Sequence, residues 1–149
     1  MQEEGIVNSE NAGHSPPCSN GVIGIGIDLV DNARMQAVLE RWGSAFKRRV
    51  FRDSERQYCD GKSEPWRHYA GRFAVKEAVS KAFGTGIGTH IGWLDIEVRR
   101  DKASGAPSVR LSDRASALAA SRGVSDIIVS LSHTRNYSVA QALLDGSQR

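Results

Sequence analysis

The stretch RFAVKEAVSKAFGTGIG, residues 72–88, joins a helical hydrophobic pattern to a run of glycines. Apolar side chains recur there at steps of three and four residues, the period of one helical face: Phe73, Ala74, Ala78, Ala82 and Phe83. The same spacing places a carboxylate and an ammonium group on one stripe of the helix, formed by Phe73, Glu77, Ser80, Lys81 and Gly84.

Two interpretations of this stripe are open. In the first, Glu77 and Lys81 form a surface ion pair worth about 0.3–0.5 kcal/mol. In the second, Lys81 meets an anion, because the alternating glycines of GTGIG let backbone amides approach a ligand closely. The end of a helix needs one glycine rather than several, so the pattern favours the second interpretation.

The composition bounds the class of protein. The 149 residues suit one domain, and no window resembles a membrane span or a signal peptide, so we expect a cytoplasmic protein with free thiols at Cys18 and Cys59. Residues 1–20 are polar and rich in Gly, Ser and Pro, which predicts a flexible leader before a domain at 21–149. Because the leader holds three Glu and no Lys or Arg, the net charge of +3 rises to +6 over the domain, and this favours an anionic partner.

An earlier stretch, VIGIGIDLV at residues 22–30, alternates as a strand does. One face is expected to hold the branched apolar side chains Ile23, Ile25, Ile27 and Leu29. The other face is expected to hold Val22, Gly24, Gly26 and Asp28. Glycines beside a carboxylate indicate that another backbone or a ligand comes close to that face, although Asp28 also suits a simple turn former at the end of a strand.

The rest of the chain predicts further helices and strands. We expect Asp31 to cap a helix that runs to Trp42 and stops at Gly43, with Met35, Val38, Leu39 and Trp42 on its packed face. Short helical pieces follow over 51–58, and Ser63 is expected to cap the central helix. Strands are expected at 94–98, from 109 onward, at 127–132 and at 137–144, with a helix after Ser112. These elements predict an α+β domain in which helices cover one side of an antiparallel sheet.

Three segments carry a family resemblance: GIGIDLVDNAR at 24–34, FAVKEAVSKAFGTGIG at 73–88 and SLSHTRNYSVAQA at 130–142. In this order and spacing they resemble the signatures of holo-acyl-carrier-protein synthases, the small bacterial type of 4′-phosphopantetheinyl transferase. The chain departs from the usual pattern at Asn32, where such sequences usually have a branched apolar residue, and at Ala106, where they usually have lysine.

The resemblance implies a fold, an assembly and a reaction. Members of the family are α+β proteins that form homotrimers with an active site between neighbouring subunits. They need Mg²⁺ and move the phosphopantetheine arm of coenzyme A to a serine of apo-acyl carrier protein, in fatty-acid or polyketide synthesis, with release of adenosine 3′,5′-bisphosphate.

The resemblance also implies the roles of individual residues. Asp28 and Glu77 would hold Mg²⁺, which proteins commonly bind through one or two carboxylates, and Glu77 and Lys81 would be catalytic. Arg34 and Arg41 would dock the carrier protein. The coenzyme A-binding residues would be Arg72, Phe73, Lys76, Ser80, Lys81, Gly84, His133 and Thr134.

Some alternatives stay open. The general base is either Glu77 or a metal-bound water that Glu77 orients. Without the resemblance, His133 suits a turn, Lys76 a solvent-exposed charge, and the basic run at 47–56 a solvated face. The alternative function is a non-catalytic coenzyme A- or nucleotide-binding module. A nucleic-acid partner is not expected, since the chain lacks interleaved aromatic residues and any zinc or helix-turn-helix signal.

Overall fold

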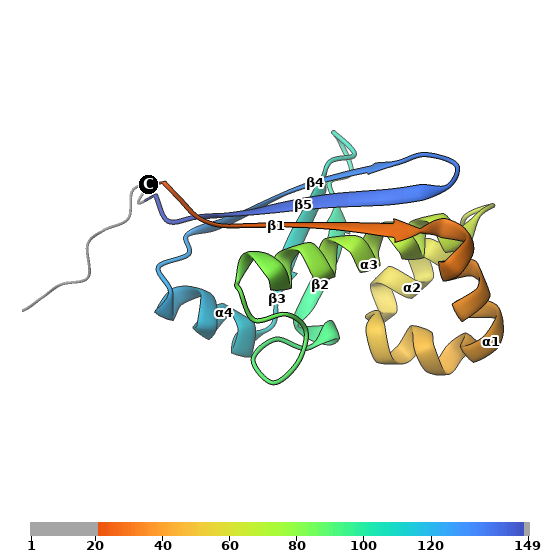
Figure 1. The fold of residues 1–149 in the computed structure, drawn as a ribbon, viewed down its shortest axis with the longest axis horizontal. Coiled ribbons are helices and arrows are strands. Elements are labelled where there is room, and N and C mark those ends of the chain that lie inside the picture. Colours follow the sequence, from red (N-terminus) through yellow and green to blue (C-terminus); the bar gives the residue numbers. More distant parts are fainter. Residues whose placement is uncertain (1–20, 148–149) are drawn as a thin grey trace, which may run out of the picture.

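The main sheet of the protein has three antiparallel strands in the order β1-β5-β4. The computed structural model describes residues 21–147, so the leader predicted over residues 1–20 lies outside the described residues. The strands are β1 (Val22–Asp31), β4 (Asp126–His133) and β5 (Tyr137–Asp145). Figure 1 shows the helix α3 (Pro65–Ala82) running along one face of this sheet. The expected α+β architecture, an antiparallel sheet packed against helices, is confirmed.

Two glycines let β1 lie directly on the backbone of α3. A Cβ atom at Gly26 would come within 1.9 Å of the carbonyl oxygen of Ala78, and one at Gly24 within 2.3 Å of that of Ala82. No side chain fits into such a gap. The expectation that another backbone approaches the glycine face of this strand is therefore confirmed, and the contact holds the Asp28 face of β1 against the helix.

The hydrophobic core fills the space between the sheet and α3. Small buried side chains meet there, with Ala74, Ala78 and Val79 on the helix and Ala140 and Ala142 on β5. Small residues at both surfaces allow the helix and the sheet to pack closely. Because α3 is buried on most sides, little of its surface remains for solvent.

A second buried cluster joins α3 to two helices at one end of the molecule (Figure 1). They are α1 (Asn32–Val50) and α2 (Asp53–Asp60). Gly43 interrupts α1 with a φ of 49° and a ψ of −130°, so the stop expected there is a kink. Met35 and Phe51 are buried in this cluster together with Tyr69 of α3.

The remaining elements form a smaller unit. Strands β2 (Ile96–Arg100) and β3 (Pro107–Leu111) pair antiparallel as a separate sheet. The expected strand at 94–98 starts later because the 3₁₀ turn η1 (Trp93–Asp95) takes its first residues. Ser112 caps α4 (Asp113–Ser121) through its side chain, as expected.

Three local expectations are wrong. A bulge between Val22 and Gly24 reverses the alternation at the start of β1, so Ile23 packs on the core while Val22 is exposed. Trp42 lies outside the packed face of α1, with 56% of its surface exposed. Ser63 does not cap α3, whose N-cap is Glu64. In the described part of the chain, none of the helices has the length and hydropathy of a membrane span.

Candidate active site

Asp28 of β1 and Lys81 of α3 meet where the strand runs along the helix. The Nζ atom of Lys81 donates hydrogen bonds to Asp28 Oδ1 at 2.8 Å and to the carbonyl oxygen of Ile27 at 3.1 Å. The Asp28 side chain keeps 15% of its surface exposed and that of Lys81 keeps 48%. Asp28 is therefore part of a site shared with α3 and is more than a turn former, and Lys81 makes an ion pair with Asp28.

Glu77 lies one turn before Lys81 and belongs to the same site. Burial raises the pKa of the Glu77 carboxyl above its ordinary value, and the negative charge of Asp28 raises it further, against the opposing effect of Lys81. Two carboxylates from different elements thus interact electrostatically. A bound cation would neutralise the repulsion between these two carboxylates.

A groove of about 580 Å³ opens beside the two carboxylates. Asp28 and Glu77 line it together with Arg34, Phe73 and Tyr137, and Met35 and Val38 of α1 line it as well. The groove combines charged and apolar side chains, which is typical of a site for an organic ligand.

The two carboxylates of Asp28 and Glu77 suit magnesium better than a metal that takes three or more protein ligands. Residues 21–147 contain no group of three or more His, Cys, Asp or Glu side chains that could hold a metal ion. Mg²⁺ commonly takes one or two carboxylates, and substrate phosphates and waters complete its coordination. Asp28 and Glu77 are therefore able to hold Mg²⁺ when a phosphate-bearing ligand supplies the remaining oxygens.

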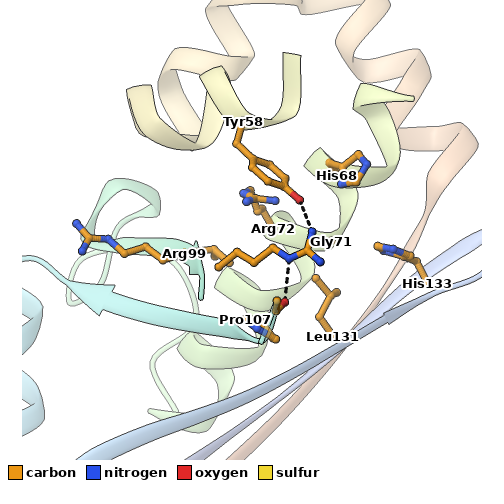
Figure 2. Close-up of a pocket in the computed structure, with 11 residues that line it drawn as sticks. Tyr58, His68, Gly71, Arg72, Arg99, Pro107, Leu131 and His133 are labelled. Carbon is orange, nitrogen blue, oxygen red and sulfur yellow. Dashed lines mark hydrogen bonds between the residues drawn. The ribbon is translucent and has the colours of Figure 1, made fainter. Parts of the chain in front are cut away.

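A second pocket, of about 230 Å³, is strongly basic (Figure 2). Arg72 of α3 stacks on Tyr58 of α2, with its Cζ atom 4.0 Å from the ring centroid. Arg100 of β2 donates a hydrogen bond to the Tyr58 hydroxyl at 3.1 Å. The edge of the pocket holds His68 and His133, whose ring centroids are 6.1 Å apart. None of the residues that line this pocket is acidic.

The electrostatics of this pocket favour an anion. Burial lowers the pKa of His68, and the neighbouring His133, Arg72, Lys62 and Arg67 lower it further. The pKa of His133 is lowered by burial and then by Arg67. The Nε atom of Arg72 is buried without a hydrogen-bond partner. A bound phosphate would reduce the repulsion between these positive charges. It would also accept hydrogen bonds from the guanidinium group of Arg72.

Two residues expected to bind coenzyme A do not face a ligand. The ammonium group of Lys76 is fully buried, 2.8 Å from Glu55 Oε2, and it also donates to the carbonyl oxygens of Val50 and Trp93. It is therefore not a solvent-exposed charge, and it lines neither of the two pockets. Ser80 is fully buried too, and its Oγ donates to the carbonyl oxygen of Glu77 within the helix. Both side chains are covered within the fold and line neither of the two pockets, so their assignment to coenzyme A stays a prediction that the fold does not support.

Arg72 is also buried, with 6% of its surface exposed, but it lines the basic pocket, and the other expected residues remain accessible. Phe73 is half-buried in the groove beside Glu77, where its ring lies 4.7 Å from that of Trp93. Gly84 follows α3 with a φ of 70°, and Thr134 begins the turn after β4, where its backbone nitrogen donates to the carbonyl oxygen of Tyr137. Arg34 and Arg41 are exposed on α1.

Sequence reasoning missed His68, Tyr58 and Arg100 as members of the basic pocket. His68 lies one helical turn before Arg72, so the four-residue spacing is a signal that could have identified it. Tyr58 and Arg100 come from α2 and β2, and no local spacing connects them with α3. Only the folded arrangement brings these residues together.

The model of the 4′-phosphopantetheinyl transferase superfamily matches residues 24–142, and the chain belongs to this superfamily. Within it, the chain is similar to holo-[acyl-carrier-protein] synthases. That of Chlamydia trachomatis serovar L2 is 41% identical over 124 residues, which cover 83% of this chain and 100% of the relative. That of Serratia proteamaculans is 44% identical over 125 residues, which cover 84% and 98%.

Solved structures give the same assignment. The holo-[acyl-carrier-protein] synthase of Neisseria meningitidis superimposes with a TM-score of 0.78 at 29% identity, covering 83% of this chain and 98% of that one. The enzyme of Helicobacter pylori, solved in complex with coenzyme A, has a TM-score of 0.72 at 31% identity and covers 81% and 99%. The resemblance in the sequence is confirmed.

Proposed function

We propose that this protein transfers the 4′-phosphopantetheine arm of coenzyme A to a serine of an apo-acyl carrier protein and releases adenosine 3′,5′-bisphosphate. The observation that carries the proposal is the meeting of Asp28 and Glu77 at one groove, with Lys81 bonded to Asp28. Phosphoryl transfer needs this combination, because catalysis depends on positioning and on neutralising phosphate charge. A module that only binds coenzyme A has no need of two interacting carboxylates at this place.

Asp28 and Glu77 are the proposed ligands of Mg²⁺, one from a strand and one from a helix. The metal, when bound, supplies positive charge to the oxygens of the pyrophosphate. Lys81 binds the phosphate on which charge develops as the leaving group departs. Its present pairing with Asp28 keeps the ammonium group at the site before a substrate arrives.

Glu77 also receives the proton of the attacking serine hydroxyl, directly or through one water that it orients. Its raised pKa supports this role, because a base is most effective when its pKa lies closer to the working pH. The serine approaches from the groove side, where the carboxyl group faces open space.

The basic pocket is the proposed site of the nucleotide and its 3′-phosphate. Arg72 and His133, which both line this pocket, are the proposed contacts of the phosphate. Thr134, in the turn after β4, and Gly84, after the end of α3, are proposed as further contacts, and Phe73 packs against the ligand in the groove.

Arg34 and Arg41 are the proposed docking residues for the carrier protein. Both are exposed on α1, and Arg34 lines the groove that holds Glu77. Positive charges at the rim of a site raise the rate of encounter with an acidic protein and fix its orientation.

A homotrimer with active sites between subunits is the proposed assembly. The sheet face opposite α3 carries large apolar side chains in the open: Ile25, Ile27, Leu29 and Ile128 are 52–62% exposed. Ile25 and Ile128 both lie opposite Leu143, so they share one face across the three strands. A contiguous apolar face of this kind is typical of a surface that a second subunit covers.

Intact-mass analysis of an apo-acyl carrier protein tests the proposed function. Incubation with this protein, coenzyme A and Mg²⁺ should add about 340 Da, the mass of one phosphopantetheine arm. EDTA should prevent the gain, and so should Asp28→Ala or Glu77→Ala, while the circular dichroism of both variants stays that of the wild type. Measurable binding of coenzyme A without any gain of mass would favour the non-catalytic binding module.

A further inference from the structure

Asn32, the first residue of α1, is a buried polar residue at the corner between β1 and α1. Only 2% of its surface is exposed. Its backbone nitrogen donates a hydrogen bond of 2.8 Å to the carbonyl oxygen of Asn136, in the turn between β4 and β5. The corner is thus tied to a turn more than a hundred residues away in the sequence.

The side chain of Asn32 makes further bonds to the same hairpin. Its Nδ2 donates to the carbonyl oxygens of Thr134 at 3.2 Å and Arg135 at 3.1 Å. Its Oδ1 accepts a hydrogen bond of 2.7 Å from the Oγ of Ser138, which is fully buried. Donors and acceptor of the amide are all used, and all of them bind the β4–β5 hairpin.

The turn needs this support because packing does not hold it. Thr134, Arg135 and Asn136 are all exposed. The hydroxyl of Thr134 accepts hydrogen bonds from the backbone nitrogens of Asn136 and Tyr137, which close the turn on itself. Those bonds set the internal shape of the turn, whereas the bonds from Asn32 set its position relative to the domain.

We infer that Asn32 is a positioning residue for the coenzyme A site, because it fixes the turn that directly follows His133 and contains Thr134. Asn32 follows Asp28 by four residues. The strand that carries the proposed metal ligand therefore leads into the residue that holds the turn beside the basic pocket. This inference rests on the proposed assignment of His133 and Thr134 to coenzyme A.

The chemistry of an amide is specific for this task. An apolar side chain of similar size fills the same space but gives no donor to the two turn carbonyls and no acceptor to Ser138. The carbonyls of Thr134 and Arg135 can then turn to water, because the turn is exposed, and only the backbone bond from Asn32 to Asn136 still holds the turn to the corner. Ser138 is left with a buried hydroxyl that has lost its partner.

The test compares Asn32→Leu, Ser138→Ala and the double variant. For Asn32→Leu we expect a Kd for coenzyme A raised about tenfold, a kcat within about twofold, and faster hydrogen exchange at residues 134–138, since misplaced binding groups cost affinity. Asn32→Leu should also lower the melting temperature, because the Ser138 hydroxyl loses its partner. In the double variant, which lacks this hydroxyl, the melting temperature should recover while the Kd for coenzyme A stays high. Ser138→Ala alone, which leaves the bonds to the turn carbonyls, should raise the Kd about twofold and keeps the test valid if Asn32→Leu does not fold.

Ser112→Ala is the matched control. It removes a half-buried hydrogen-bonding hydroxyl at the cap of α4, outside both pockets, and should lower the melting temperature while the Kd for coenzyme A stays unchanged. An unchanged Kd in Asn32→Leu would overturn the inference, as would a Kd that recovers together with the melting temperature. Because the Kd is measured without turnover, a wild-type protein that binds coenzyme A but does not transfer the arm refutes the proposed function alone.

Discussion

Replacing Lys76 with methionine should strongly destabilise the protein without touching the coenzyme A site. Lys76 Nζ and Glu55 form an ion pair whose two side chains are both fully buried. Glu55 also accepts hydrogen bonds from the backbone nitrogens of Arg52 and Val98. The pair therefore ties α3 to α2 and to strand β2 at the centre of the molecule.

The magnitude follows from the burial. Removing one partner of a buried ion pair leaves an uncompensated charge and costs about 3–5 kcal/mol, which for a domain of this size lowers the melting temperature by roughly 10–20 °C. Burial lowers the pKa of Lys76 in spite of the attraction by Glu55, so the cation itself is costly to bury. The double variant Lys76→Met/Glu55→Gln should therefore recover most of the loss.

Calorimetric melting at fixed protein concentration checks the stability, and titration with coenzyme A checks the site. The reasoning is refuted if Lys76→Met loses less than about 1 kcal/mol. It is also refuted if the affinity for coenzyme A falls while the stability is unchanged, because the ammonium group would then reach the ligand.

Three further predictions concern other surfaces. The pKa values of His68 and His133 lie below the ordinary value, and a bound phosphate favours their protonated forms. The affinity for coenzyme A, measured by calorimetry, should therefore rise as the pH falls from about 7.5 to about 6. Coenzyme A lacking the 3′-phosphate is the control and should show a flatter pH profile. Ile27→Asp should break the proposed subunit contact, and light scattering should then give the 16.2 kDa mass of one chain; an unchanged oligomer would exclude this sheet face as the interface. The double charge reversal Arg34→Glu/Arg41→Glu should weaken binding of the carrier protein about tenfold and leave that of coenzyme A unchanged, and equal losses in both titrations would contradict the docking role.

The central contact of the site could be predicted from local sequence. The glycine face of residues 22–30 indicated a close backbone approach, and the spacing of Glu77 and Lys81 indicated a shared helical stripe. Both are features of a strand or a helix alone, so they need no knowledge of distant partners. The meeting of Asp28 with Lys81 then follows from where that strand lies.

The surroundings of Lys76 and Asn32 could not be predicted in this way. A helical pattern shows which residues share a face, but α3 is covered on several faces, and the burial of Lys76 depends on Glu55, 21 residues earlier. The bonds of Asn32 span more than a hundred residues. Polar residues with remote partners look like surface residues in a sequence until the fold brings the partner near.

The contact at Gly26 constrains how this protein can change. The distance between the strand that carries Asp28 and the helix that carries Glu77 is set by two backbones in direct contact, with no side chain between them. Mutation elsewhere in the core can be absorbed by repacking, but here nothing smaller than glycine exists and anything larger forces the strand and helix apart. A random library at this position should therefore return glycine alone among active clones, while neighbouring Ile25 and Ile27 accept other apolar residues. The separation between Asp28 and Glu77 therefore depends on a residue that has no side chain.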